Sequence, residues 1–414
     1  MDNLTHTLIG ALVGETAARI TSSNKAGLEP ARRRNLLVTV AAVSSNLPDL
    51  DFIYSAITRS KLDYLLQHRG FTHTVIGLVI AAAVTLLACE GWCRWRRWNL
   101  ARSDRLQLGG IALLTLLLHV AMDFANSYGV HPFWPFYNGW LYGDSIFIVE
   151  PLLWAAAAPL TFLFRSLAAR VLVALALVAG IGLGFGSGLM PATFALILTM
   201  VSIAMLVIGY RAAPRTALFA GIALWIAVTA IFTAAHGIAS RQIASLTARQ
   251  FEGAQLLDNV LTPMPSNPVC WDSLLLLVRG DEYMIRHATW SIAPSVITAD
   301  ACPTRMVATE MTAPSVAVPA ANNASVHWWG EVAMPRDQIA KLAATNCEAA
   351  AFLRFARAPW SAQQDGRTVI GDLRYDREAG LGFAELALQE ETARCPQHVP
   401  PWIAPREDLI SSSR

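Results

Sequence analysis

Hydrophobic residues in the first 236 positions are gathered into runs of the length that crosses a bilayer, roughly 17 to 25 residues each. Two shorter segments, Leu4–Ile20 and Leu36–Leu47, we interpret as helices that pack against the others, either spanning or partly embedded. The pattern therefore predicts six to eight membrane helices. The longer runs are Thr74–Cys93, Leu106–Asp123, Ile146–Phe164 and Val171–Gly186, followed by Ala192–Ile208 and Ala217–Ala235.

The pattern changes at about residue 237, after which charged residues and prolines occur throughout. Stretches such as Arg367–Asp376 alternate between apolar and polar residues, which is typical of strands. The predicted fold class is therefore mainly α, a polytopic membrane helix bundle followed by a C-terminal extramembrane α+β domain. We divide the chain into a first set of membrane helices (1–155), additional transmembrane helices (156–236) and a soluble domain (237–414).

The distribution of charge predicts which side of the membrane each end faces. Only 15% of the residues are charged, and the net charge of +2 gives no reason to expect a nucleic-acid partner. Arginines cluster in alternate connections, whereas residues 123–145 contain no Lys or Arg. By the positive-inside rule the clusters are cytoplasmic, so both termini and the C-terminal domain are predicted to lie outside. No basic segment precedes the first apolar stretch, so we expect no cleaved signal peptide. The clusters are Arg32–Arg34, Arg94–Arg105, Arg165 with Arg170, and Arg211 with Arg215.

Histidines and acids from several helices fall near the predicted outer ends of those helices. His119 and Asp123 are spaced i, i+4, so they share one helix face in an otherwise apolar run, where ionisable groups are costly and tend to be functional. Imidazoles together with carboxylates suit zinc or manganese better than calcium or magnesium. We therefore predict a site for one or two divalent ions, with Zn²⁺ favoured and Mn²⁺ as the second choice. The predicted metal ligands are His6, Asp49, Asp51, His68, His73, His119 and Asp123.

Each of these residues also has a simpler interpretation. His6 could be a polar residue near a chain end, and His119 with Asp123 could be a hydrogen-bonded pair that stabilises the bundle. His131 stands among aromatic residues and is more typical of the membrane interface than of a ligand. The four C-terminal cysteines could form two disulfides in three pairings, or remain free thiols. These are Cys270, Cys302, Cys347 and Cys395.

The motifs "DNLTHTLIGA", "SNLPDLD", "HRGFTHT", "LLHVAMDFANSYGVHPFWPF" and "GDSIFIVEPLLW" resemble those of membrane-bound metal-dependent hydrolases of the bacterial inner membrane, which are linked to the LexA regulon in some bacteria. The resemblance is strong over residues 1–155 and looser beyond. It implies a distant relation to zinc-dependent phospholipases C, whose ligand order is matched by His6, Asp49, His73 and the pair His119 and Asp123. The later His and His-x-x-x-Glu elements of those enzymes have no clear match, and Glu150 stands where the membrane family is expected to have Asp.

The function that we predict is hydrolysis of a phosphoester or other ester in a lipid-like amphiphile at the outer face of the inner membrane. Asp51 is the candidate general base, Arg69 the candidate anion-binding residue, and His68 a further catalytic candidate. The predicted partners are the lipid bilayer and this substrate. No G-x-S-x-G motif indicates a nucleophilic serine. The alternatives are an ion- or proton-coupled transporter, or a non-catalytic envelope protein with a structural metal.

Overall fold

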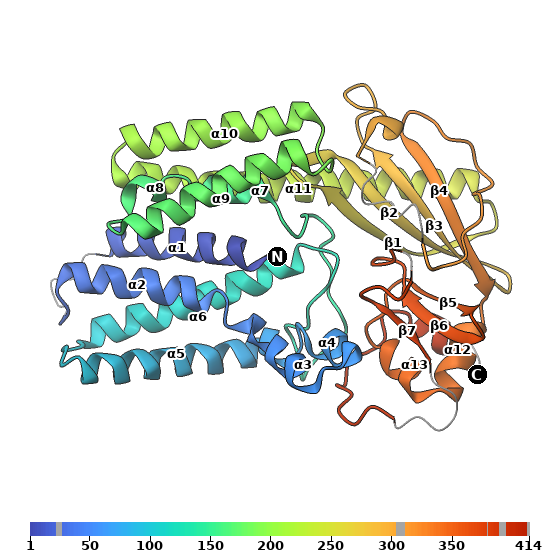
Figure 1. Ribbon diagram of the computed structural model, residues 1–414, viewed down its shortest axis with the longest axis horizontal. Helices are drawn as coiled ribbons and strands as arrows, with labels where there is room; N and C mark the ends of the chain where they lie inside the picture. The colour runs from blue at the N-terminus through green and yellow to red at the C-terminus, as the bar shows by residue number, and fades with distance from the viewer. Residues whose placement is uncertain (22–26, 304–310, 379, 389–394, 412–414) are drawn as a thin grey trace.

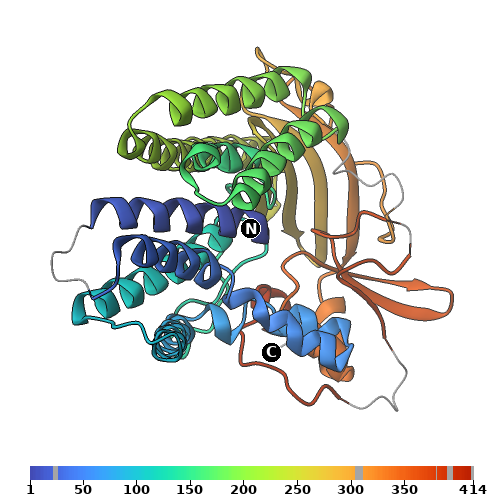
Figure 2. The same cartoon turned by 60° about the vertical axis from the view of Figure 1, so that its left-hand side comes forward.

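The computed structural model describes residues 1–21, 27–303, 311–378, 380–388 and 395–411. A bundle of roughly parallel helices forms one half of the molecule, and two β-sheets with short helices form the other half (Figure 1). Seen from a second direction, the sheets stand across one end of the bundle (Figure 2). The predicted fold class, a membrane helix bundle followed by an α+β domain, is confirmed.

Among the described residues, five helices are long and apolar enough to cross a membrane. They include α5, whose outward side chains such as Val79, Ile80, Val84 and Leu87 are exposed and apolar, as expected of a surface that faces lipid. A sixth span is possible by length and composition if α2 (Pro30–Ser44) is joined to the bent segment Pro48–Thr58. Five spans are one fewer than the smallest predicted number, and six are reached only when this bent pair is counted as one span. The five helices are α5 (Val75–Trp95), α6 (Arg102–Phe124), α9 (Leu167–Gly186), α10 (Ala192–Arg211) and α11 (Pro214–Gln250).

One predicted span, Ile146–Phe164, differs from expectation, whereas the predicted packed helix Leu4–Ile20 forms as α1. The run Ile146–Phe164 forms only two short helices, α7 (Pro151–Ala156) and α8 (Leu160–Leu163), so it is not one long spanning helix. Residues 152–160 are largely buried within the bundle, which explains why their sequence is as apolar as that of a lipid-facing span. Helix α1 (Asn3–Ile20) lies inside the bundle and carries Glu15, which is buried and paired with Arg34.

Helix α11 continues from the bundle into the C-terminal half. Its 37 residues correspond to about 55 Å, whereas the hydrocarbon core of a bilayer is about 30 Å thick. The last turns bury Ala239, Ile243 and Leu246 in the same hydrophobic cluster as Trp271 and Leu275 of the sheet. The domain boundary that we predict at residue 237 therefore falls within a continuous helix.

The C-terminal half contains two antiparallel sheets. The first has the order β1–β2–β3–β4, and the second has the order β5–β6–β7. The strands are β1 (Gln255–Met264), β2 (Asn267–Arg279), β3 (Glu282–Ser291), β4 (Val326–Pro335), β5 (Pro359–Gln364), β6 (Arg367–Asp372) and β7 (Glu385–Ala387). The helices are α12 (Gln338–Thr345), α13 (Cys347–Phe352) and α14 (Glu407–Ile410).

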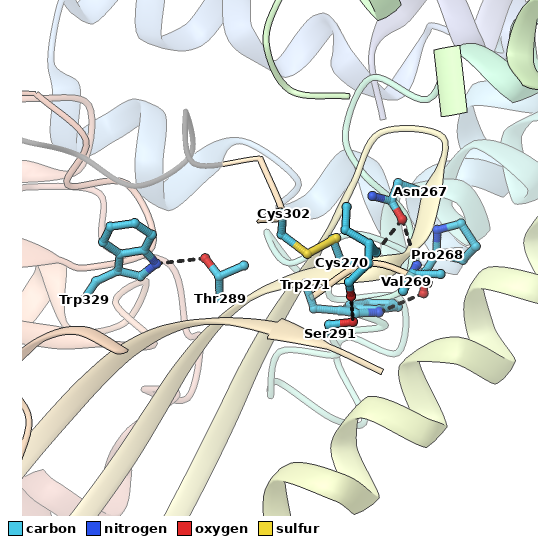
Figure 3. Close-up of a disulfide and its surroundings, with 10 residues drawn as sticks. Asn267, Pro268, Val269, Cys270, Trp271, Thr289, Ser291, Cys302 and Trp329 are labelled. Atoms are coloured by element: carbon cyan, nitrogen blue, oxygen red, sulfur yellow. Dashed lines mark hydrogen bonds between the residues drawn. A yellow bond between two sulfur atoms is a disulfide. The ribbon is translucent and has the colours of Figure 1, made fainter. Parts of the chain in front are cut away.

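Two disulfides stabilise this half, Cys270–Cys302 and Cys347–Cys395, which resolves the pairing that the sequence left open. Figure 3 shows the first of them beside the β1–β2 turn, where Asn267 Oδ1 accepts hydrogen bonds from the backbone N–H groups of Val269 and Cys270. These hydrogen bonds fix the direction of the chain as it leaves the turn. The disulfide joins Cys270, at this point of the chain, to Cys302.

The bundle and the sheets share one hydrophobic core. Leu65 and Leu66 of α4 (Lys61–Gln67) and Tyr128 from the loop after α6 are buried in the same cluster as Trp360 and Phe355. Polar contacts join the two halves as well, since the indole N–H of Trp402 donates to the carbonyl oxygen of Leu66 at 2.9 Å. The end of the bundle that faces the sheets is therefore covered by the C-terminal domain.

Candidate metal centre

Four buried side chains from three segments converge at the end of the bundle that faces the sheets. Asp49 lies on the short 3₁₀ turn η1 (Pro48–Asp51), His73 ends the turn η2 (Phe71–His73), and His119 and Asp123 lie one helical turn apart on α6. One ligand atom from each lies within 4.8 Å of all the others. Their side chains are at most 10% exposed. Groups of this kind are buried in proteins when they bind a cation or one another.

The spacing of the donor atoms fits a small divalent cation. The Nε2 atoms of His73 and His119 are 3.1 Å apart, and they lie 3.2 and 3.3 Å from Asp123 Oδ2. Asp49 Oδ1 is 3.5 Å from each imidazole. Ligands at the zinc–nitrogen distance of about 2.0–2.1 Å in a tetrahedron would be separated by about 3.3 Å. The donor set of two imidazoles and two carboxylates also suits zinc or manganese.

Hydrogen bonds outside the cluster hold both imidazoles with Nε2 toward its centre. His119 Nδ1 lies 2.8 Å from the carbonyl oxygen of Ser45, so this nitrogen carries the proton and donates it. His73 Nδ1 lies 3.0 Å from the Thr72 hydroxyl and 3.5 Å from Asp51 Oδ2. Such partners are typical of metal-binding histidines, because they fix the tautomer that leaves the other nitrogen free to coordinate.

Asp51 lies one layer outside the four-residue group, although the sequence analysis includes it among the ligands. Its Oδ2 accepts hydrogen bonds from the Arg69 backbone N–H and the Thr72 hydroxyl, both at 2.9 Å. Its Oδ1 lies 2.9 Å from Nδ1 of His68. Asp51 therefore contacts the Nδ1 atoms of both His68 and His73 and orients the two rings. His68, like Asp51, lies outside the four-residue group.

His6 lies at the edge of the cluster. Its ring stacks on that of His119 with centroids 3.8 Å apart, and its Nε2 is 3.2 Å from Asp123 Oδ1. The amino nitrogen of Met1 contacts the same oxygen. The two oxygens of Asp123 thus have different partners. Oδ2 faces the imidazoles of His73 and His119, whereas Oδ1 faces His6, Met1 and the guanidinium of Arg69.

Arg69 is the buried cation beside this centre. Its Nη2 is 3.1 Å from Asp123 Oδ1, and its Nη1 donates to Asn126 Oδ1 at 2.8 Å. The guanidinium carbon lies 4.8 Å from the centre of the Tyr128 ring, a cation–π contact. The backbone of Arg69 has φ of 59°, a left-handed conformation that is uncommon for a residue with a side chain. Arg69 is therefore held in place by the fold before any ligand arrives.

A cavity of about 780 Å³ opens over Asp49, His68 and Arg69. Its remaining walls come partly from the C-terminal domain, through Tyr375, Arg377, Glu378 and Phe383, and partly from aromatic and apolar residues of the bundle half. The sequence analysis did not identify these wall residues of the C-terminal domain. Beyond residue 155 the looser resemblance includes the motifs "PMPSNPVCW" (Pro263–Trp271) and "GDLRYD" (Gly371–Asp376), and the second of these contains the wall residue Tyr375.

His131 is placed away from the centre. It is fully buried, it stacks on Trp402 with ring centroids 3.9 Å apart, and its Nδ1 is 3.3 Å from the Arg69 carbonyl oxygen. Burial lowers the pKa of His131 to about 3, so the ring is neutral. Its role is to support the backbone of Arg69.

Glu150 is also placed away from the centre, as the N-cap of α7. It accepts hydrogen bonds from the backbone N–H of Leu152 and from both the backbone N–H and the hydroxyl of Ser266, which lies in the β1–β2 turn. Burial raises the pKa of Glu150 to about 7. This carboxyl group therefore joins the bundle to the first sheet.

Comparison with known proteins places the chain in a family. No solved structure matches it. It is 28% identical over 157 residues to the uncharacterized protein YfhP of Bacillus subtilis (strain 168), an alignment that covers 37% of this chain and 43% of that relative. The chain thus spans less than half the length of the relative. The profile of the YdjM inner membrane protein family matches residues 1–214, which is more than half of the chain. The chain belongs to the YdjM inner membrane protein family.

Proposed function

We propose that this protein is a membrane-bound, metal-dependent hydrolase that cleaves a phosphoester or other ester of a lipid-like amphiphile at the outer face of the inner membrane. The observation that carries the proposal is the buried group of Asp49, His73, His119 and Asp123, one member of which, Asp49, lines a cavity large enough for a lipid headgroup. The resemblance of the N-terminal motifs to those of metal-dependent hydrolases supports the same conclusion.

His73, His119 and Asp123 would hold the metal most closely, with Asp49 on the side that borders the cavity. A divalent cation bound here, Zn²⁺ or Mn²⁺, would supply an activated water and polarise the scissile group. The fixed orientation of both imidazoles means that binding requires little rearrangement of the chain.

Proton transfer is assigned to the pair of Asp51 and His68. Asp51 accepts the Nδ1 proton of His68, so the opposite nitrogen, Nε2, is the one that can accept a proton from a nucleophilic water or return it to a leaving group. His68 lines the cavity and is partly exposed, as this role requires. Arg69, which is already fixed, would stabilise negative charge on the substrate.

The outer face is supported by the arrangement of charge and by the cysteines. Helix α5 ends and α6 begins at the end of the bundle away from the sheets, so the connection that carries Arg96 and Arg97 lies there (Figure 1). By the positive-inside rule we expect that end to be cytoplasmic, which supports a periplasmic location for the cavity and the C-terminal domain. Two disulfides in this domain also fit an oxidising compartment.

The test compares purified wild type with His119→Ala, Asp123→Asn and a control, His398→Ala, which removes an exposed imidazole of the C-terminal domain. Elemental analysis measures bound metal, and release of phosphate or of the headgroup from short-chain phospholipids measures activity with and without chelator. We expect the first two variants to lose both metal and activity, and the control to retain both. Metal that remains in both site variants would refute the ligand assignment, and metal-loaded wild type that cleaves no lipid ester would refute the hydrolase.

A further inference from the structure

The cavity above the metal centre is completed by the C-terminal domain. Asp49, His68 and Arg69 come from the bundle half, whereas Tyr375, Arg377 and Phe383 come from the segment after β6. These groups are separated by about 300 positions in the sequence and meet only because the two halves share one core. A site confined to the membrane helices would lack one side.

The segment that supplies this side is anchored at its start. The guanidinium of Arg374 forms hydrogen bonds with both oxygens of Asp372, and its Nη1 donates to the carbonyl oxygen of Ser127 at 2.6 Å. Ser127 belongs to the loop that follows α6, which carries His119 and Asp123. The position of the segment is therefore tied to the helix that holds two of the metal ligands.

A second set of bonds fixes the segment from the other direction. Asp376 accepts hydrogen bonds from the backbone N–H groups of Thr312 and Ala313 at 2.9 and 2.8 Å. Nearby, Arg357 is buried between Asp144 of the bundle half and Asp258 of β1, at 2.9 and 2.8 Å. With Arg374 and Asp376 both held, the intervening Tyr375 has a defined position at the cavity, and Arg377 directly follows it in the wall.

The chemistry of the walls indicates the class of ligand. Arg69 and Arg377 are arginines from the two halves, and guanidinium groups are well suited to bind phosphate because they donate several hydrogen bonds in one plane. The apolar wall residues Phe52, Ile148 and Phe383 are each between 39% and 46% exposed. Such a combination fits a molecule with an anionic head and an apolar tail.

We infer that the C-terminal domain forms part of the substrate site, with Arg377 as a specificity-determining residue for a lipid phosphate head and Phe383 as a contact for its acyl part. This inference rests on the proposed function, whose substrate class it narrows to amphiphiles that carry phosphate. It also assigns a role to the C-terminal domain, which the family match at residues 1–214 does not cover.

The experiment measures binding to the full-length protein in detergent by calorimetry. The probes are dihexanoyl phosphatidic acid, its neutral counterpart dihexanoylglycerol, and inorganic phosphate. The variants are Arg377→Gln and Phe383→Ala, and the matched control is Arg367→Gln, an exposed arginine on β6 that does not line the cavity. We expect Arg377→Gln to weaken binding of phosphatidic acid by about 10- to 100-fold, as for the loss of a charge-assisted hydrogen bond, and to leave dihexanoylglycerol unchanged.

Phe383→Ala is expected to weaken binding of phosphatidic acid and not that of inorganic phosphate. Equal affinity of wild type and Arg377→Gln for phosphatidic acid, or the same loss in Arg367→Gln, would overturn the inference. Inorganic phosphate that binds as tightly as the lipid would overturn the acyl part of the inference.

Wild type that binds phosphatidic acid through Arg377 but cleaves no ester would refute the proposed hydrolase activity and leave the proposed binding site intact. Conversely, a hydrolase whose KM is unchanged in Arg377→Gln would refute only the inference.

Discussion

The burial of the Glu150 carboxyl group, which raises its pKa, predicts that the stability of the protein depends on pH. The carboxyl group is fully buried, and its pKa in the folded protein is about 7, against an ordinary value of 4.5. Between these two values the unfolded chain has lost the proton while the folded chain retains it, so stability falls as the pH rises from about 4.5 to 7 and then stays constant. The difference corresponds to about 3 kcal/mol, at about 1.4 kcal/mol per pH unit.

The substitution Glu150→Gln removes this titration and keeps a side chain of the same shape. We expect the thermal midpoint of the variant to fall by about 3 °C less than that of wild type between pH 5 and 8. Thermal unfolding in detergent, followed by circular dichroism, measures both profiles. Glu282→Gln, which changes an exposed carboxylate on β3, is the control and should follow wild type. The reasoning would be refuted if wild type and Glu150→Gln had the same pH dependence.

Three further predictions concern the site, the disulfides and the orientation. Asp51→Asn should keep the bound metal at saturating concentration. Its metal affinity or its activity should fall by about 10- to 100-fold, because the substitution alters a residue that orients His73. A chelator competition assay measures the metal affinity, and an unchanged affinity would contradict the assignment. Replacing Cys347 and Cys395 by Ser should lower the free energy of unfolding by about 4 kcal/mol, whereas Cys89→Ser should change it little, as denaturant titration will show. A reporter fused to the C-terminus should be active only when exported; activity of a cytoplasmic reporter at this position would contradict the orientation.

The seven predicted ligands include all four residues of the candidate metal-binding group, and they could be named because one half of this group is local. His119 and Asp123 are four positions apart on a long helix, and this spacing alone places them on one face. Asp49 and His73 could be added because the orientation of the helices brings their segments to the same end. The tight 3₁₀ turn η1 decides between Asp49 and Asp51, which are only two residues apart, and no periodicity in the sequence distinguishes them.

Other features depend on tertiary packing and were out of reach. The run Ile146–Phe164 has the composition of a membrane span, but it is apolar because the bundle surrounds it, and composition does not distinguish a lipid environment from a protein interior. Arg377 and Phe383 belong to a segment of ordinary composition, and only the shared core brings them to the cavity. Long-range contacts of this kind have no signature in the local sequence.

The uninterrupted course of α11 limits how the cavity can be reached. A helix that continues without a break from the lipid to the sheet cannot act as a hinge, and the buried contacts of Arg357 and Arg374 join the two halves on the other side. We therefore expect the C-terminal domain to keep its position over the bundle when a ligand enters the cavity. For the proposed lipid substrate, entry would then be lateral, past partly exposed apolar side chains such as Phe52 and Ile148, with the apolar tail remaining in the membrane.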